Sequence, residues 1–281
     1  MTAQDIRPRA TRASSARSRA SASGGSAGNR RTVVVGGVSV AVVILLCWQF
    51  LPGLTGTPGY VVPALSDVLQ ALVDPAALPR YVSNAGTTLG EVLAGLAIGV
   101  VIGLVGAILL AQFPTAYAIA FPYIVAIESI PKVAIAPLFV IWFGFGMPSK
   151  IVVVVLLAFF PVLVNTIHGI RGVDRDQVEL FEANGASAGQ IRRKLLIPAA
   201  LPSIFSGLEL AVANAMIGAI VAEFVGAQHG LGVLILQAQG AMQTAAVFAL
   251  LIILSALGIT LNALVRLARR KVIFWQQDAP R

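Results

Sequence analysis

Cysteine, histidine and charged residues are all scarce in this chain of 281 residues. The one cysteine, Cys47, lies in an apolar run without a partner, which excludes a disulfide framework and a thiolate metal site. The two histidines, His168 and His229, lie in separate segments without ligand spacing, and we expect both to be ordinary interfacial residues. Charged residues make up 11% of the chain, hydrophobic residues make up 57%, and the mean hydropathy is +0.87. These values exclude an ordinary soluble domain.

Motifs of catalysis are missing from the sequence as well. It has no GxxxxGK[ST] loop to cradle phosphates, so the chain cannot bind and hydrolyse ATP by that route. It also has no paired-histidine metal motif, and neither histidine has a triad-like setting. We therefore expect a protein that is not an enzyme and that holds no metal or cofactor of its own.

Long apolar runs predict an all-α integral membrane protein with about six transmembrane helices, since a bilayer core requires about 20 apolar residues. The first run, Thr32–Leu51, follows a basic head as a signal peptide would. It is long for a signal peptide, however, and the following Pro-Gly-Leu-Thr is not a small-residue cleavage site, so we expect a retained helix. The other predicted spans are residues 85–111, 116–130 (broken by Pro122), 151–167, 201–222 and 245–264.

Two further patterns concern the first half of the chain. In the Pro/Gly-rich connector 52–83, the segment Val62–Val73 is patterned as a short amphipathic helix, which we expect to lie against the outer membrane face. In the second span, Gly95, Gly99 and Gly103 recur at four-residue intervals. Small residues at this spacing let helices approach closely, so packing is favoured over a gating hinge.

The basic residues predict the orientation in the membrane. Residues 1–31 hold seven arginines and one acid, Asp5, in a Ser/Ala/Gly background, which predicts a disordered tail. A basic tail can indicate nucleic-acid binding, but beside a membrane helix we interpret it as a cytoplasmic anchor close to anionic lipid. With both termini inside, 17 of the 20 Lys and Arg residues lie on the inner side, and only Arg80, Lys132 and Lys150 lie outside. The positive-inside rule therefore predicts cytoplasmic N- and C-termini.

The segment Gln177–Pro202 is polar although it lies between two predicted spans. Asp174 with Gln177, and Ser187 with Gln190, have the spacing of N-terminal capping boxes. We therefore expect two short helices, separated by a stop at Asn184-Gly185. The first helix carries Val178 and Phe181 on one face, an apolar ridge that favours a docking surface over a simple connection.

Irregular backbone and acidic residues indicate where a pathway could lie. The segment Pro131–Ile151 is too rich in Pro and Gly for one straight helix, so it predicts a pathway or interface element. Four glutamates border or interrupt the apolar runs, where a charge costs about 2.5–3.5 kcal/mol. We expect Glu91 and Glu223, near span ends, to cap, pair or lie at the headgroups. Glu209, with Asn214 near it in sequence, is the preferred inward-facing candidate over Glu128.

The spacing of the polar segment resembles that of a known family. Glu179-Leu180-Phe181, three residues, Gly185, nine residues and Leu195-Leu196-Ile197-Pro198 resemble the cytoplasmic EAA loop of ABC importer permeases. Glu179, Gly185 and Pro198 match that pattern, whereas Leu180 and Phe181 stand in place of two alanines. In this family the loop is the coupling helix, which inserts into a groove of a separate ATPase subunit. The segment PLFVIWFGFG-x-x-SK is similar to permeases for nitrate, sulfonates and taurine, whose relatives also serve precursors of vitamins.

The resemblance implies a type I ABC importer transmembrane-domain fold in a bacterial plasma (inner) membrane. It implies a homodimer of permeases, two ATPase subunits that bind ATP and Mg, and an extracytoplasmic substrate-binding protein. The solute would be small and polar, either nitrate-, sulfonate- or taurine-like or a vitamin precursor. The chain would divide into a basic tail (1–31), the first helix with its connector (32–83), a permease core (84–268) with the coupling loop (170–200), and a C-terminal tail (269–281).

Two sets of residues follow from the resemblance and the patterns together. The candidate coupling residues are Val178, Glu179, Phe181, Gly185, Ala186, Ser187 and Pro198. The candidate translocation-pathway residues are Glu128, Pro131, Pro137, Gly144, Gly146, Glu209 and Asn214.

Two other functions remain open at this point. A proton-coupled secondary transporter would use an intramembrane glutamate and show inverted halves with matching broken helices. A non-transporting membrane assembly subunit would need no pathway. Neither alternative explains the spacing from Glu179 to Pro198.

Overall fold

The computed structural model describes residues 26–275, which are almost entirely helical. They fall into two compact units divided after Pro58. The first unit contains the helix α1 (Ser26–Thr55), which confirms the first predicted span and begins before Thr32. Most of the basic head that was predicted to be disordered, residues 1–25, lies outside the described residues. The end of the predicted C-terminal tail, residues 276–281, lies outside them as well.

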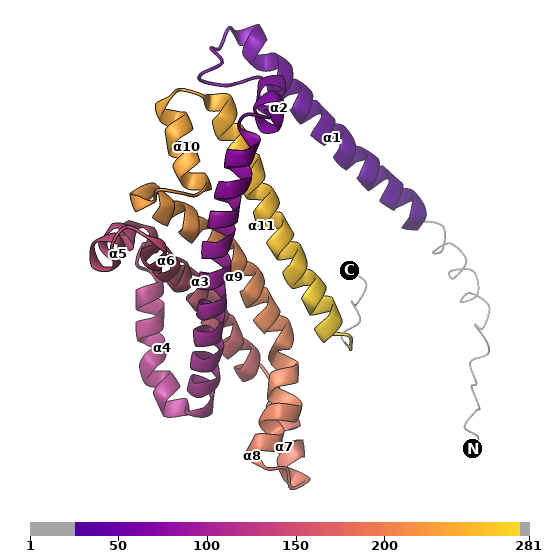
Figure 1. The fold of residues 1–281 in the computed structure, drawn as a ribbon. Coiled ribbons are helices and arrows are strands. Elements are labelled where there is room, and N and C mark those ends of the chain that lie inside the picture. The colour runs from indigo at the N-terminus through magenta and orange to yellow at the C-terminus, as the bar shows by residue number, and fades with distance from the viewer. Residues whose placement is uncertain (1–25, 276–281) are drawn as a thin grey trace, which may run out of the picture. The chain divides into compact units, whose positions relative to one another are not determined.

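The second unit is built around three long helices, α3, α6 and α9, which share its largest interfaces (Figure 1). The predicted amphipathic helix is present as α2, with Val68 on its buried side. The elements of this unit are α2 (Leu65–Val73), α3 (Leu78–Gln112), α4 (Pro114–Glu128), η1 (Lys132–Ile135), α5 (Ala136–Phe143), α6 (Met147–Arg171), α7 (Arg175–Ala183), α8 (Ala188–Ile191), η2 (Arg192–Leu196), α9 (Ile197–Gly226), α10 (Leu231–Gly240) and α11 (Thr244–Val272).

The number of spans agrees with the predicted architecture. Within residues 26–275, five helices are long and apolar enough to cross a membrane, and six if α4 and the η1–α5 segment count as one bent span. Apart from α4, which ends at Glu128, the observed helices extend beyond the predicted ones at both ends; α3 begins at Leu78 and α6 at Met147. The reason is that backbone hydrogen bonding continues into polar flanks that hydropathy leaves out of a span.

The glycine stripe of α3 packs directly on α6, which confirms its predicted role. A Cβ atom added at Gly95 would lie 2.5 Å from the Val154 Cβ, and one at Gly99 would lie 3.1 Å from the Ala158 Cβ. Gly103 is in the same position against Val162. Around this contact the small and branched side chains of α3, α6, α9 and α11 form the largest buried apolar cluster of the unit.

Two local predictions were wrong, and one helix was not predicted. The helix α4 continues through Pro122, because a single internal proline removes one backbone hydrogen bond and leaves the others in place. The second short helix of the polar segment does not end before the fifth span; α8 continues through one π-helical turn, η2, into α9. The helix α10 was not predicted, because its ten residues are too few for a span and Gly226 and Gly230 interrupt the apolar pattern before it.

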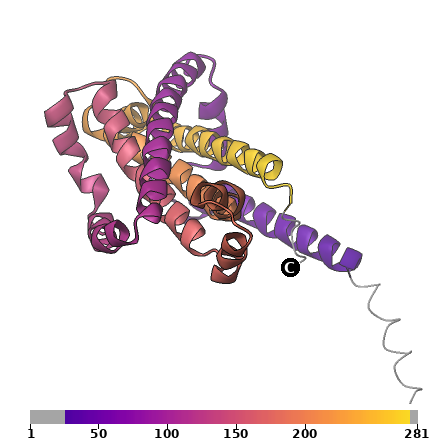
Figure 2. The same ribbon diagram turned by 90° about the horizontal axis from the view of Figure 1, so that it is seen from below.

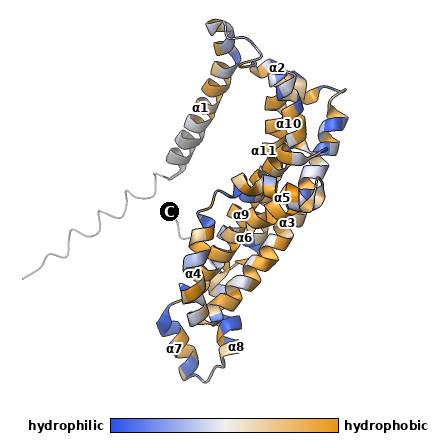
Figure 3. Cartoon of the chain, turned by 90° about the vertical axis from the view of Figure 1, so that its left-hand side faces the viewer, coloured by the Kyte–Doolittle hydropathy of each residue, from blue (hydrophilic) through white to orange (hydrophobic). Residues whose placement is uncertain are grey.

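The two ends of this unit differ in chemistry. The short helices α7 and α8 lie at one end, while α2 and α10 lie at the other (Figure 1). Figure 3 shows hydrophilic residues gathered on α7 and α8, whereas the long helices between the ends are mostly hydrophobic. Figure 2 views the molecule from below, the side on which α7 and α8 lie in Figure 1. We refer to these two ends as the α7–α8 end and the α2–α10 end.

Candidate functional site

The loop at the α7–α8 end turns its corner at Gly185. The backbone of Gly185 has φ +74°, and its N–H donates to the Glu182 carbonyl at 2.9 Å. The N–H of Ala186 donates to the Phe181 carbonyl at 3.0 Å. These two bonds form a Schellman motif, which ends a helix with a residue in the left-handed region. The predicted glycine stop is therefore present and has the predicted conformation.

Both helices of this loop are capped at their first turn. Ser187 and Gln190 form the predicted capping box, with the Ser187 N–H donating to Gln190 Oε1 at 2.8 Å and the Gln190 N–H to Ser187 Oγ at 3.4 Å. At α7, Asp174 caps through the N–H of Asp176 at 3.1 Å, instead of the predicted pairing with Gln177. The corner is thus set by local hydrogen bonds, which sequence spacing can indicate.

The apolar side chains of α7 point in different directions. Leu180 is 62% exposed, so it is the large apolar side chain that this loop presents to its surroundings. Phe181 is half-buried. Val178 is also half-buried and lines a pocket of about 220 Å³ together with residues of α3, α6 and α8. Val178 therefore faces its own subunit, and Leu180 is an exposed candidate that the sequence analysis did not single out.

The remaining predicted coupling residues are distributed along the loop. Glu179 and Ser187 are exposed, and Ala186, the residue that follows Gly185, is half-buried. Pro198 lies in the first turn of α9, directly after the π-helical turn that joins α8 to α9. The helix terminus that bears Pro198 is thus continuous with the loop.

Five of the predicted pathway residues lie on the broken segment between α4 and α6. The axes of α4 and the η1–α5 segment differ by 77°. Glu128 and Pro131 are exposed at the break, where the Lys132 Nζ donates to the Glu128 carbonyl at 3.0 Å. The segment ends at Gly144, with φ +78°, and Gly146. Pro137 is exposed in the first turn of α5.

The other two pathway candidates lie elsewhere on α9. The carboxylate of Glu209 is half-buried and pairs with Arg269 of α11 at 3.4 Å. Asn214 Nδ2 donates to the Leu157 carbonyl of α6 at 3.5 Å. The broken segment meets α9 at Gly226, where an added Cβ would lie 2.8 Å from the Phe145 ring. Glu209 precedes Gly226 by about 25 Å of helix, so its carboxylate lies far from this meeting point.

A buried polar cluster joins α3, α6 and α9. We call Glu91, Lys150 and Glu223 the acid–lysine cluster; they are 0%, 5% and 1% exposed. Lys150 Nζ donates to Glu91 Oε1 and to the His229 carbonyl, the latter at 3.4 Å. The prediction that Glu91 and Glu223 cap, pair or lie at the headgroups is right about pairing for Glu91. Charge counting places Lys150 on the outer side of the membrane without indicating its environment, and the structure shows its side chain buried in an ion pair with Glu91.

The same cluster anchors the turn between α9 and α10. Glu223 Oε2 accepts from the Gly232 N–H at 2.5 Å, and Glu223 Oε1 accepts from Thr88 Oγ1 at 2.6 Å. The N–H groups of Gly230 and Leu231 donate to Asn84 Oδ1 and Thr88 Oγ1 at 2.7 Å and 2.9 Å. A sequence signal for this site exists: Glu91 lies four residues before Gly95, on the buried stripe of α3.

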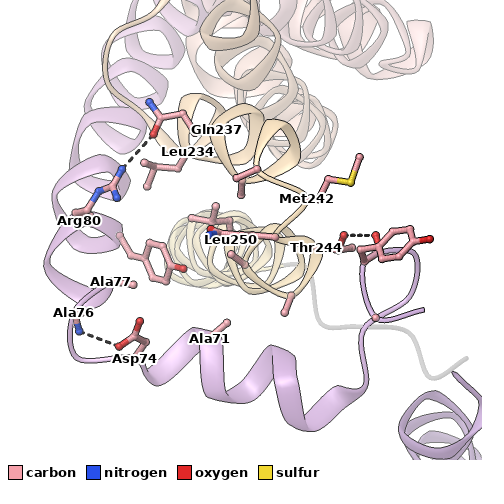
Figure 4. A pocket seen from close by; sticks show the side chains of 18 residues that line it. Ala71, Asp74, Ala76, Ala77, Arg80, Leu234, Gln237, Met242, Thr244 and Leu250 are labelled. Atoms are coloured by element: carbon pink, nitrogen blue, oxygen red, sulfur yellow. Dashed lines mark hydrogen bonds between the residues drawn. The ribbon is translucent and has the colours of Figure 1, made fainter. Parts of the chain in front are cut away.

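A large pocket opens at the α2–α10 end. Its volume is about 720 Å³, and its walls come from α2, the first turn of α3, α10 and the start of α11 (Figure 4). Arg80 Nη2 donates to Gln237 Oε1 at 3.2 Å across the pocket, and Asp74 accepts from the Ala76 N–H at 3.0 Å. The pocket thus combines both signs of charge with apolar walls.

Comparison with known proteins identifies the family of the chain. Residues 95–274 match the family described as "Binding-protein-dependent transport system inner membrane component". The chain belongs to this family. The match includes the corner at Gly185, the broken segment from Pro131 and the α9–α10 turn.

Individual relatives cover most of the chain. A probable ABC transporter permease protein of Haemophilus influenzae is 39% identical over 78% of this chain and 89% of its own length. The formylaminopyrimidine transport permease protein ThiX of Halalkalibacterium halodurans is 33% identical over 84% of this chain and 94% of its own. The putative aliphatic sulfonates transport permease protein SsuC of Bacillus subtilis is 32% identical over 89% and 91%.

The fold also matches a solved transporter. An inward-facing structure of the MetNI methionine ABC transporter superposes with a TM-score of 0.58 at 22% identity, covering 71% of this chain and 99% of that chain. The type I importer fold is thereby confirmed. The chain is a multi-pass inner-membrane permease subunit of a binding-protein-dependent ABC importer, so neither the proton-coupled secondary transporter nor the assembly subunit describes it.

Proposed function

We propose that this permease imports a small polar solute by coupling the motion of two ATPase subunits to alternating access. The observation that carries the proposal is the loop at the α7–α8 end, where a Schellman corner and a capping box hold an exposed apolar side chain between two spans. Such a rigid, exposed projection suits the groove of a partner protein. The partner ATPase would bind ATP and Mg, and this chain would hydrolyse nothing itself.

The contact with the ATPase centres on Leu180. This side chain is the most exposed large apolar group of α7, with the carboxylate of Glu179 beside it in sequence. Phe181 and Gly185 set the direction of the helix through the corner, and Ser187 fixes the start of α8. Because α8, η2 and α9 form one continuous helical path, closure of the ATPase dimer would move the α9 span through Pro198.

The orientation follows from charge. The loop between α6 and α9 carries Arg171, Arg175, Arg192, Arg193 and Lys194, and the C-terminal turn of α11 carries Arg269, Arg270 and Lys271. The positive-inside rule therefore favours a cytoplasmic α7–α8 end and cytoplasmic N- and C-termini. The α2–α10 end, with the pocket of Figure 4, would then face the extracytoplasmic substrate-binding protein.

The pathway would run along the broken segment in a homodimer. Ile141, Trp142 and Phe145 are 75%, 65% and 77% exposed on this segment, and irregular backbone at membrane depth requires protein or a water-filled path beside it. A second permease subunit would supply that cover. Glu128, Pro131, Pro137, Gly144 and Gly146 would border the path, with Glu209 and Asn214 further along α9.

The solutes to test are those named for the relatives. The chain is similar to permeases whose names specify formylaminopyrimidine and aliphatic sulfonates. Nitrate and taurine complete the set, because the segment around Pro137–Lys150 resembles that subfamily. Uptake of each solute in cells that carry the permease with its own ATPase and binding protein identifies the solute.

Co-purification tests the coupling contact. The tagged full chain is expressed with the ATPase subunit of its own host and purified in detergent. We expect the native chain to retain the ATPase and Leu180→Asp to lose it, because the substitution places a charge in an apolar contact. Gln177→Asp is the matched control, since it adds the same charge to an exposed position of the same helix. Full retention by Leu180→Asp, or no ATPase with the native chain, would contradict the proposal.

A further inference from the structure

The acid–lysine cluster contains more negative than positive charge. Glu91 of α3 and Glu223 of α9 are two acids, and Lys150 of α6 is their one buried cation. Thr88, whose hydroxyl donates to Glu223 Oε1, lies one helical turn before Glu91 on α3. Lys150 joins Glu91 to the turn that Glu223 anchors, so the two carboxyl groups lie in one buried cluster. The charged neighbours of each carboxyl are the other carboxyl and Lys150. If all three groups were ionised, the site would carry one surplus negative charge.

The hydrogen bonds at the cluster leave one oxygen without a partner. Lys150 donates to Glu91 Oε1. The two oxygens of Glu223 accept from Thr88 and from the Gly232 N–H. Glu91 Oε2 is buried and has no hydrogen-bond partner within the described part of the chain. A carboxylate oxygen that is buried and unpaired is unfavourable, because its lost hydration is not replaced.

The turn between α9 and α10 supplies only partial compensation. Gly232 lies in the first turn of α10, and the N-terminus of a helix has the effect of about half a positive charge. The His229 side chain is exposed, and the residue faces the cluster through its carbonyl, which accepts from Lys150. The surplus charge is therefore not neutralised by the surrounding elements.

We infer that Glu91 and Glu223 together hold one proton, so that the acid–lysine cluster is a neutral, buried proton-binding site of the permease. A proton between Glu91 Oε2 and the Glu223 carboxyl turns one acid into a donor, which satisfies the unpaired oxygen and removes the surplus charge. The proton belongs to the pair and not to either residue. It also prevents repulsion between two like charges on α3 and α9.

This site is independent of the transported solute and of the ATPase contact. It lies among α3, α6, α9 and the first turn of α10, whereas the coupling contact lies on α7 at the opposite end of the unit (Figures 1 and 3). A failure of the co-purification experiment would therefore leave this inference standing, and the reverse also holds.

Infrared spectroscopy of the purified full chain in lipid nanodiscs at neutral pH tests the inference. We expect the native protein to show the carbonyl stretch of a protonated carboxyl group. Glu223→Gln and Glu91→Gln should each abolish this band, because the single remaining acid can pair with Lys150 as an anion. Glutamine has the shape of a protonated glutamate, so both variants can keep the fold; gel filtration verifies it.

Glu209→Gln is the matched control, because Glu209 is a half-buried acid of α9 in its own ion pair with Arg269. It should leave the band unchanged. The native spectrum alone can overturn the inference, if no protonated carboxyl is present at neutral pH. A band that persists in both Glu223→Gln and Glu91→Gln would overturn it as well.

Discussion

Lys150 both pairs with a buried acid and holds the turn between α9 and α10. Its ammonium group pairs with Glu91 and donates to the His229 carbonyl, so it links α6 to α3 and to the turn after α9. Charge counting assigns it to the outer side of the membrane with Arg80 and Lys132, because it lies between the third and fourth predicted spans, and this count carries no information on burial. The difference matters energetically, since removing one partner of a buried ion pair leaves the other charge uncompensated.

Lys150→Met should destabilise the permease strongly. We expect a loss of about 3–5 kcal/mol in the free energy of unfolding, the usual cost of breaking a buried pair. The midpoint of thermal unfolding in detergent measures the loss. Arg269→Met is the control, because it breaks the half-exposed pair with Glu209 and should cost about 0–1 kcal/mol. The double variant Lys150→Met/Glu91→Leu should recover much of the stability; equal midpoints for the two single variants would contradict the assignment.

At the scale of the element, the close contact between α3 and α6 depends on the glycines of α3, which have no side chains. Gly95→Val should lower stability by about 1–3 kcal/mol, the range for overpacked sites, because its Cβ would lie 2.5 Å from the Val154 Cβ. Gly90→Val on the same helix is the control, since its nearest neighbour is the flexible end of Met147 at 3.6 Å. Thermal unfolding of both variants in detergent measures the difference, and a Gly95→Val protein as stable as the control would refute the packing role.

At the corner of the coupling loop, the backbone conformation of residue 185, and not contact with neighbouring atoms, restricts which amino acid can occupy the position. A Cβ at Gly185 would meet no atom within 4 Å, yet the φ of +74° is unfavourable for other residues by about 1–2 kcal/mol. Gly185→Val should therefore insert into the membrane normally, but the ATPase subunits assembled with it should hydrolyse ATP without solute uptake. The matched control is Gly189→Val in α8, where space is equally open and φ is ordinary.

The ratio of ATP hydrolysed to solute taken up in reconstituted vesicles measures this coupling. We expect a higher ratio for Gly185→Val than for both the native chain and Gly189→Val. Normal coupling in Gly185→Val would show that the left-handed corner is not needed for transmission.

At the scale of the whole molecule, the exposed apolar surface of the broken segment requires a partner or lipid. If two copies of this chain form the pathway, native mass spectrometry of the assembled transporter should show two permeases of one sequence and two ATPase subunits. The Leu180→Asp variant should keep the permease pair while losing the ATPases, since its change lies on α7, away from the broken segment. A complex with one copy of this chain and one sister permease would contradict the homodimer.

Features that depend on neighbours in sequence were predictable for this chain. The spans follow from apolar length, and the corner of the coupling loop follows from the spacing of Ser187, Gln190 and Gly185, because caps and left-handed turns are made by bonds within a few residues. The family also follows from this loop, since the spacing from Glu179 to Pro198 is itself the family's pattern.

Features that depend on contacts between distant segments required the tertiary structure. Glu91, Lys150 and Glu223 are far apart in sequence. Glu91 continues the four-residue spacing of the glycine stripe of α3, but no local pattern pairs it with Lys150 or Glu223. The direction of the Val178 side chain and the exposure of Leu180 depend on how α7 packs against α3 and α8. The spacing of apolar residues along α7 alone does not predict this packing. The sequence also did not predict that α8 continues into α9, because a proline such as Pro198 usually marks a helix boundary. In the structure a π-helical turn joins the two helices, and Pro198 lies in the first turn of α9.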